Sequence, residues 1–195
     1  MDSKLLNSII ISIDGLDGTG KTPISKYLEN KLQNSVEIKR IIGVPDKYVD
    51  KLAYNSFSID TQYLYYLASF VDSMMKATKK HTVVLLDRSY YSTMAYHTAY
   101  GCKIEVSNIF NAFRKPDLSL YLSTDAKTIT SRLQKRDELD WYEKQLIKET
   151  ALGLRIESIY ESFGLQKIDS TNIDEAKVQT LDIVRQYLKT ANQLR

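Results

Sequence analysis

A glycine-rich turn between a strand-like and a helix-like segment constrains this chain more than any other feature. Residues 15–22, Gly-Leu-Asp-Gly-Thr-Gly-Lys-Thr, match the pattern G-x-x-x-x-G-K-[ST]. β-Branched residues dominate positions 9–13 before the turn, and an amphipathic stretch at 21–32 follows it. Glycines let backbone N–H groups approach an anion closely, and the next helix adds its unsatisfied N-terminal donors. The sequence therefore predicts a phosphate-binding loop made of Gly15, Asp17, Gly18, Thr19, Gly20, Lys21 and Thr22.

Four side chains would supply the chemistry at such a loop. Lys21 places a point charge on a transferring phosphate, and Thr22 offers its hydroxyl to Mg²⁺. Asp87 follows the apolar run 83–86 and is the candidate for a second magnesium position, although aspartate there also serves as a turn or cap. Arg88 comes next and can hold a phosphate by two parallel hydrogen bonds. The pattern predicts ATP and Mg²⁺ as ligands, and catalysis by Lys21, Asp87 and Arg88.

Short apolar runs alternate with longer amphipathic stretches along the whole chain. Strands are predicted at 9–13, 36–42, 82–86, 118–122 and 166–168. Helices are predicted at 21–32, 61–80, 127–135, 142–160 and 174–188, while 43–60 stays unassigned as loop and short helix. This alternation favours a parallel sheet with helices on both faces. Because no repeat or linker interrupts it, residues 1–195 are expected to form a single α/β domain with a five-stranded sheet.

The predicted helix at 61–80 carries two sets of apolar side chains. The i, i+3, i+4 spacing predicts one buried face made of Leu64, Leu67, Ala68, Val71, Met74 and Met75. Tyr63, Tyr66 and Phe70 then remain as aromatic surface, suited to a pocket or to a subunit contact.

Composition narrows the class of partner. The formal net charge is only +3 and the basic residues are scattered, so no nucleic-acid footprint is expected. No apolar run approaches the ~20 residues that cross a bilayer, and we expect neither a membrane span nor a signal peptide. The single cysteine, Cys102, allows no internal disulfide and suits a reducing compartment. We therefore expect a cytoplasmic protein that acts on small molecules.

Four stretches carry a resemblance to a known family, and they occur in the family's order. They are the loop at 13–22, Asp87-Arg88-Ser89-Tyr90-Tyr91-Ser92-Thr93-Met94-Ala95-Tyr96, the stretch from Pro116-Asp117 to Lys135-Arg136 and Glu143, and Ile168-Asp169-Ser170-Thr171. The second is similar to the family's D-R-[YH]-x-x-S-x-x-A-Y. On these residues the chain resembles the thymidylate kinases, which are P-loop nucleoside monophosphate kinases. The resemblance implies a P-loop kinase fold and a role in nucleotide biosynthesis.

The resemblance also implies an acceptor site. Asp17 would accept a hydrogen bond from the 3′-hydroxyl of the acceptor sugar, although the residue also suits an Asx turn. Arg88 would hold the acceptor phosphate beside the γ-phosphate of ATP. The base and sugar would contact Ser92, Thr93 and Tyr96. Tyr66 would stack on the base, although aromatic residues at helical spacing also pack in cores.

Further roles implied by the resemblance lie in the C-terminal half. A small lid is expected near 135–145. Arg132 and Arg136 would belong to the lid region, with Arg136 neutralising the transferred charge, although a solvated basic face is the alternative. The adenine of ATP would contact Asp169, Ser170 and Thr171. Family members are commonly dimers, so the resemblance is compatible with a homodimer.

Several positions depart from the family pattern. Phe70 stands where the family has a thymine-reading arginine, four residues after the stacking aromatic. Ser89 replaces the usual Tyr or His, and Asp-Arg-Ser is similar to the deoxynucleoside kinases. Trp141 occupies a lid position that is often arginine. Lys47 is the best match for the basic acceptor-binding residue after the family's loop proline.

These departures make the acceptor the open question. We expect a nucleoside monophosphate kinase with an altered base pocket, which tolerates several bases and is a poor thymidylate kinase, because Phe70 cannot donate a hydrogen bond. The alternative is a deoxynucleoside kinase, or another small-molecule P-loop kinase. A neutral hydroxyl acceptor profits from a carboxylate base, and Asp46 is the candidate. A non-catalytic switch is disfavoured by the complete set of phosphate and magnesium residues.

Two histidines remain. His81 precedes a predicted strand and is expected in a surface turn. His97 follows Tyr96 on a predicted pocket helix, so it could reach the acceptor, but a position on the helix surface is the expectation.

Overall fold

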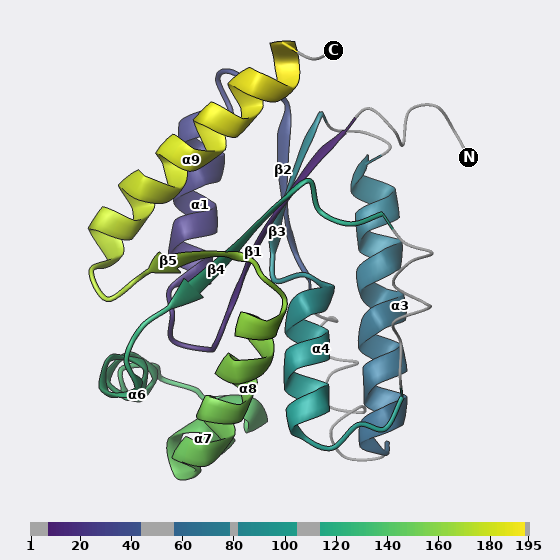
Figure 1. The fold of residues 1–195 in the computed structure, drawn as a ribbon, viewed down its shortest axis with the longest axis vertical. Helices are drawn as coiled ribbons and strands as arrows, with labels where there is room; N and C mark the ends of the chain where they lie inside the picture. The colour runs from purple at the N-terminus through teal and green to yellow at the C-terminus, as the bar shows by residue number, and fades with distance from the viewer. Residues whose placement is uncertain (1–7, 44–56, 79–81, 105–113, 194–195) are drawn as a thin grey trace.

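A five-stranded, all-parallel sheet forms the centre of the computed structural model, which describes residues 8–43, 57–78, 82–104 and 114–193 (Figure 1). The strand order is β2-β3-β1-β4-β5. The strands are β1 (Ile9–Gly15), β2 (Ile38–Ile42), β3 (Val83–Asp87), β4 (Leu118–Ser123) and β5 (Gln166–Asp169). The helices are α1 (Lys21–Leu32), α3 (Ile59–Thr78), α4 (Tyr90–Ala99), α6 (Ala126–Gln134), α7 (Trp141–Lys148), α8 (Thr150–Ser162) and α9 (Ile173–Gln193). The predicted α/β fold is confirmed.

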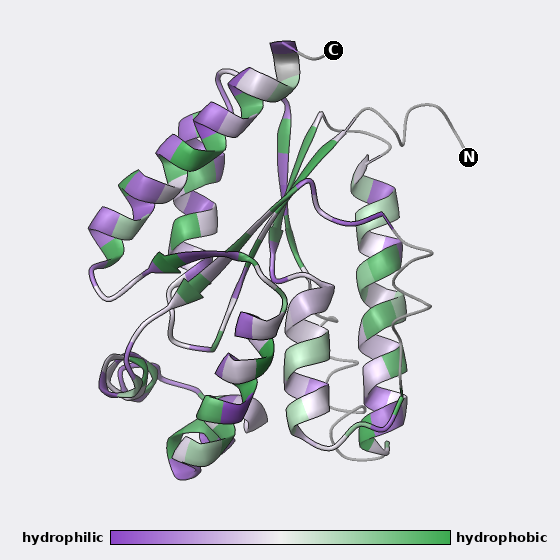
Figure 2. Ribbon diagram, in the orientation of Figure 1, coloured by the Kyte–Doolittle hydropathy of each residue, from purple (hydrophilic) through white to green (hydrophobic). Residues whose placement is uncertain are grey.

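The central strand β1 is buried along its whole length because helices cover both faces of the sheet. Its odd-numbered isoleucines, from Ile9 to Ile13, pack with α1 and α9 on one face. Ile10 points the other way and packs with α3 and with Val84 and Leu86 of β3. Side chains that alternate between two covered faces explain why these strands read as nearly continuous apolar runs. Figure 2 shows the apolar residues gathered on the strands and on the helix stripes that face them.

A third apolar cluster joins α6, α7 and α8 to α4 and to the phosphate loop. Tyr160 of α8 is fully buried there, stacked on Tyr121 of β4 at 5.0 Å between ring centroids. Its hydroxyl donates to Ser92 Oγ at 2.9 Å and to the Gly15 carbonyl at 3.3 Å. The cluster therefore attaches the C-terminal helices directly to the two segments that carry the predicted site.

Two details of the helices differ from prediction. The predicted helix at 142–160 is interrupted at Glu149, whose backbone is extended (φ −127°, ψ 90°), so that α7 and α8 are separate helices. The buried face of α3 is formed by Tyr63, Tyr66, Leu67, Phe70 and other residues, whereas Leu64 and Met75 are exposed. The aromatic rings take the core side because they bury more apolar area than Leu or Met. In the described part of the chain, no helix is long and apolar enough to cross a membrane.

Candidate active site

The phosphate loop connects β1 to α1 as predicted. Gly18 and Gly20 have positive φ values of 86° and 95°, which side chains rarely adopt, so the turn depends on glycine at these positions. Gly20 precedes the first turn of α1 and has no side chain to cap it, which leaves the helix N-terminus open to an anion. Lys21 Nζ donates to the carbonyls of Gly15 at 2.9 Å and Leu16 at 2.6 Å. Burial, reinforced by Arg88, lowers the pKa of Lys21 to about 7.

Asp87 ends β3 beside α1 and is 2% exposed. Its Oδ2 accepts from Ser25 Oγ at 3.0 Å and from Arg40 Nη1 at 3.1 Å. Ser25 Oγ also donates to the Thr22 carbonyl at 3.0 Å, so one side chain of α1 ties the two predicted magnesium residues together. The described residues hold no cluster of three or more metal-binding side chains. A carboxylate and a hydroxyl fit Mg²⁺, which takes few protein ligands and keeps water and phosphate oxygens.

Arg88 follows Asp87 in a left-handed backbone conformation, with φ of 75°, the one non-glycine residue of the described chain with positive φ. Its N–H donates to the Ile13 carbonyl at 3.0 Å, and Gly43 of the β2 end packs against its carbonyl. Its guanidinium forms an ion pair with Asp17 of the phosphate loop and lies over the Tyr96 ring, 5.7 Å from the centroid. The backbone conformation thus turns the arginine back towards the loop.

Asp17 is bonded through both carboxylate oxygens. Besides Arg88, it accepts from the Tyr96 hydroxyl at 2.8 Å, and its own N–H donates to that hydroxyl oxygen at 2.9 Å. Burial opposes ionisation of Asp17, but Arg88 and Lys21 outweigh burial and hold its pKa below the ordinary value. Asp17 therefore stays charged and anchors Arg88 at the loop.

A second buried carboxylate, Asp14, organises the start of α4. Its Oδ1 accepts from Ser89 N at 2.8 Å and Ser92 Oγ at 2.7 Å, and its Oδ2 accepts from Ser89 Oγ at 2.8 Å. Ser89 Oγ also caps α4 by accepting from Tyr91 N at 3.1 Å. The serine that departs from the family pattern therefore joins β1 to α4, which carries several pocket residues.

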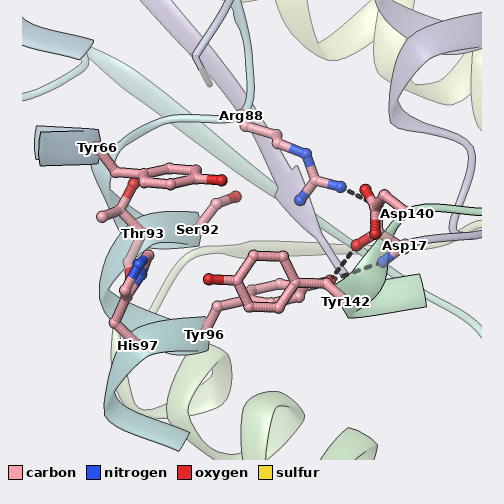
Figure 3. Close-up of a pocket in the computed structure, with 9 residues that line it drawn as sticks. All are labelled: Asp17, Tyr66, Arg88, Ser92, Thr93, Tyr96, His97, Asp140 and Tyr142. Atoms are coloured by element: carbon pink, nitrogen blue, oxygen red, sulfur yellow. Dashed lines mark hydrogen bonds and ion pairs between the residues drawn. The ribbon is translucent and has the colours of Figure 1, made fainter. Parts of the chain in front are cut away.

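One pocket collects most of the predicted acceptor residues (Figure 3). It is lined by Asp17, Tyr66, Arg88, Ser92, Thr93, Tyr96, His97, Asp140 and Tyr142. Asp140 and Tyr142 were not among the predicted acceptor residues, and His97 was named only as an alternative to a position on the helix surface. Asp140 and Tyr142 come from the start of α7, far along the chain from α4, so only the fold brings them here. Asp140 belonged to a stretch that carries the family resemblance and both residues fell within the predicted lid, but no signal assigned either of them to the acceptor.

The expected position of His97 on the helix surface is wrong, because the residue is 1% exposed. Its Nδ1 lies 2.8 Å from the Thr93 carbonyl, and since a carbonyl can only accept, Nδ1 carries the proton. Nε2 is buried and has no hydrogen-bond partner among the residues that the structure describes. Burial lowers the pKa of His97 to about 4, against the opposing effect of the bond to Thr93. The imidazole is therefore neutral at pH 7, with Nε2 as a hydrogen-bond acceptor.

The predicted adenine residues lie beside the phosphate loop. Arg132 of α6 donates to the carbonyls of Gly18 at 3.2 Å, Ser170 at 2.8 Å and Thr171 at 3.0 Å. Thr171 N donates to Asp169 Oδ1 at 2.8 Å, which fixes the turn after β5. Arg132 therefore links this turn to the loop.

Arg136 lies in the segment before α7. It forms an ion pair with Glu143, and its side chain is 47% exposed. Asp140 caps α7 by accepting from Glu143 N at 2.8 Å, while Glu143 Oε2 accepts from Asp140 N at 2.9 Å. This capping box places Tyr142 in the pocket and keeps Arg136 beside the helix start.

Phe70 is the described acceptor candidate that does not join the pocket. Phe70 is 2% exposed and packs in the core of α3 and β3, edge-on to Tyr90 at 6.0 Å between centroids. It does not line the pocket in the described part of the chain. Lys47 and Asp46 lie outside the described residues.

The parallel sheet, the phosphate loop at the end of β1 and the Asp87–Arg88 pair at the end of β3 define a P-loop kinase. The sequence model of the thymidylate kinase family matches residues 13–179. The chain therefore belongs to the thymidylate kinase family and is an ATP-dependent nucleotide kinase.

Curated relatives agree with this assignment over nearly the whole chain. A probable thymidylate kinase of Methanobrevibacter smithii is 30% identical, with 85% of this chain and 92% of the relative covered. A thymidylate kinase of Staphylococcus haemolyticus is 28% identical and covers 93% of this chain and 100% of the relative.

Two solved structures, a thymidylate kinase and a deoxynucleoside kinase, share the fold of this chain. The thymidylate kinase of Candida albicans, described as having broad substrate specificity, superposes with a TM-score of 0.68 at 20% identity, covering 93% of this chain and 92% of that one. A deoxyadenosine kinase of M. mycoides superposes with a TM-score of 0.64 at 20% identity, covering 93% of this chain and 100% of that one. At this identity the likeness concerns the fold.

Proposed function

We propose that this chain transfers the terminal phosphoryl group of ATP, in the presence of Mg²⁺, to the phosphate of a nucleoside monophosphate. The position of Arg88 carries the proposal, because its guanidinium lies in the pocket wall and is held to the phosphate loop by Asp17. A cation at this point can hold an acceptor phosphate in line with the γ-phosphate. An acceptor that is already an anion requires no general base.

Lys21 and Arg88 would neutralise the charge that develops during transfer. Lys21 bonds to loop carbonyls in this structure, so its Nζ already lies at the loop where the phosphates would bind. Thr22 and Asp87 would hold Mg²⁺, which supplies further charge neutralisation at the phosphate oxygens. Arg40 keeps the Asp87 carboxylate in place.

The C-terminal segments would complete the ATP site. We assign Asp169, Ser170 and Thr171 to the adenine and its ribose, because Arg132 holds their turn against the phosphate loop. Residues 135–145 would act as a lid. Arg136 of this segment, paired with Glu143 and 47% exposed, would supply a further positive charge to the transferred phosphoryl group.

The base end of the pocket supports an altered specificity. Arg88 is the only arginine that lines the pocket in the described part of the chain. Around the remaining wall lie Tyr66, Thr93, His97 and Tyr142. With no arginine to donate to a thymine carbonyl, we propose that thymidine monophosphate is not strongly preferred.

A deoxynucleoside kinase is the second candidate. The solved deoxyadenosine kinase of similar fold was described with dCMP as a product. The Asp87-Arg88-Ser89 sequence resembles the motif of the deoxynucleoside kinases. A hydroxyl acceptor would need a carboxylate base. Of the pocket carboxylates, Asp17 is engaged by Arg88 and Tyr96, and Asp140 caps α7. These bonds favour the monophosphate.

Exposed apolar side chains on α3 could form the contact between the two subunits of the expected homodimer. Leu64 is 45% exposed and Met75 is 42% exposed. We propose that a second copy of the chain covers this helix. Light scattering on the purified protein would give a dimer mass, whereas a monomer at micromolar concentration would contradict the assignment.

The test of the function is a panel of nucleosides and their monophosphates, assayed for ADP release and product formation. We expect kcat/KM to be higher for monophosphates than for their parent nucleosides, and transfer to stop in excess chelator. Arg88→Ala should abolish most activity, while Arg155→Ala, which removes an exposed arginine paired with Glu149, should not. Higher kcat/KM for nucleosides would favour the second candidate, and a hundredfold preference for thymidine monophosphate would contradict the altered pocket.

A further inference from the structure

We propose that Nε2 of His97 selects the acceptor by accepting a hydrogen bond from an N–H group of its base. This inference rests on the proposed function and names the residue that determines base specificity at the same site. The chemistry that it recognises is an N–H donor, either the ring imide of a keto pyrimidine or the exocyclic amine of an adenine or cytosine.

The first argument is the fixed proton on the imidazole. Nδ1 must donate to the Thr93 carbonyl at 2.8 Å, so Nε2 carries a lone pair and not a proton. Nε2 is buried without a hydrogen-bond partner in the part of the chain that the structure describes. Nearly all buried polar atoms are hydrogen-bonded, and an exception in a ligand pocket indicates a group that the ligand satisfies.

The second argument is that aromatic rings hold the imidazole in one orientation. Tyr63 and Tyr66 of α3 lie with ring centroids 5.4 Å and 5.1 Å from that of His97. Tyr142 of α7 approaches from another side at 6.3 Å. Rings from two helices and the bond to Thr93 leave little freedom for the side chain to turn. A preorganised acceptor discriminates better than a mobile one, because it cannot move away to find another partner.

The third argument is position. Arg88 precedes α4, whereas His97 lies seven residues into the helix from Tyr90, which corresponds to about 10 Å along its axis. Figure 3 shows the two side chains on different sides of the pocket, with Tyr66 and Tyr142 near its middle. An acceptor whose phosphate meets Arg88 would direct its base towards His97.

A site with a buried acceptor atom rejects a ligand that cannot donate to it, since binding leaves the atom unpaired. The experiment therefore compares acceptor monophosphates that differ only in the N–H group. The pairs are thymidine monophosphate with its N3-methyl analogue, deoxycytidine monophosphate with its N4,N4-dimethyl analogue, and deoxyadenosine monophosphate with its N6,N6-dimethyl analogue. For each pair the ratio of kcat/KM is measured with wild type and with His97→Phe, which keeps a ring but lacks the nitrogen.

For at least one pair we expect wild type to favour the N–H compound by about 10- to 100-fold. His97→Phe should reduce that ratio to within about threefold of unity. The pair that responds identifies the source of the N–H group. Tyr63→Phe is the matched control, because it alters a ring neighbour of His97 outside the pocket lining and should keep the wild-type ratio.

Equal ratios in wild type and His97→Phe for every pair would overturn the inference while the kinase function stands. Failure of every monophosphate and nucleoside to accept phosphate would instead contradict the proposed function. If His97→Phe does not fold, the ¹⁵N resonance of Nε2 in wild type serves as the readout. It should shift on addition of an N–H compound and not of its methylated partner, and no shift with any compound would overturn the inference.

Discussion

The buried imidazole of His97 should make the stability of this protein depend on pH in a defined window. Burial holds its pKa at about 4, whereas an exposed histidine titrates near ~6.5. Between these values the unfolded chain binds the proton and the folded chain does not. The free energy of unfolding therefore rises with pH across this window. The stability that the neutral imidazole contributes is lost progressively as pH falls from about 6.5 towards 4.

The size of the effect follows from the two pKa values. At pH 5 the unfolded histidine is almost fully protonated, and at pH 7 it is mostly neutral. Acidification from pH 7 to 5 should thus cost about 2 kcal/mol of stability through His97 alone. The rings that surround it are tyrosines 63, 66 and 142, whose hydroxyls carry no charge at these pH values. They leave the imidazole as the titrating group at this location.

Urea denaturation of wild type and His97→Phe at pH 7 and pH 5 measures the effect. The variant changes packing at both pH values, so the informative quantity is the difference between the two losses of stability. Wild type should lose about 2 kcal/mol more than the variant on acidification. Equal losses would refute the burial of a neutral imidazole at this position.

Three further changes test the site. Lys21→Ala should reduce turnover at least ~100-fold with an unchanged circular dichroism spectrum, because the loop loses its charge at the transferring phosphate. Arg40→Met should lower the free energy of unfolding by about 3 kcal/mol in chelator, because Asp87 stays buried without the ion pair to Arg40. Added Mg²⁺ should restore part of this free energy, and Arg40→Lys should lower it less than Arg40→Met. Ser89→Ala should cost about 1–2 kcal/mol in urea denaturation, because α4 loses its cap and Asp14 loses a bond; an unchanged midpoint would contradict it.

Most of the fold could be predicted because local signals agreed with one another. The phosphate loop stood between an apolar run and an amphipathic one, and five apolar runs alternated with helices, which leaves few topologies. The break at Glu149 could not be predicted in this way, because neither glycine nor proline marks it and glutamate is a good helix former. Residues of α7 and α8 are both buried in the third apolar cluster, a tertiary arrangement that the local sequence does not reveal.

The buried face of α3 was predicted only in part: Leu67 and Met74 are buried as predicted, whereas Leu64 and Met75 are exposed. Hydropathy ranks Leu64 and Met75 above tyrosine, but the aromatic rings of Tyr63 and Tyr66 bury larger surfaces and pack on His97. The same contact explains the wrong expectation for His97. A polar residue on a helix reads as exposed until the neighbouring helix is placed.

Some residues of the candidate site could be predicted from motifs, whereas others are brought there only by tertiary packing. Residues within motifs, such as Asp17 and Arg88, could be identified from spacing because the loop and strand ends fix their place. Tyr142 and Asp140 could not, since they reach the pocket only through the docking of α7. Their roles, like those of Arg132 and Arg136, remain predictions for the experiments above.

Gly43 belongs to none of the recognised motifs, yet it packs so closely against Arg88 that we expect substitutions at this position to impair the active site. A methyl group on its α-carbon would lie 2.0 Å from the Arg88 carbonyl oxygen and 3.3 Å from the Phe70 ring. Arg88 cannot retreat without giving up its bond to β1, so even alanine at Gly43 would displace the arginine. In a saturation mutagenesis screen for kinase activity, Gly43 should therefore score like an active-site residue, although it does not line the pocket in the described part of the chain.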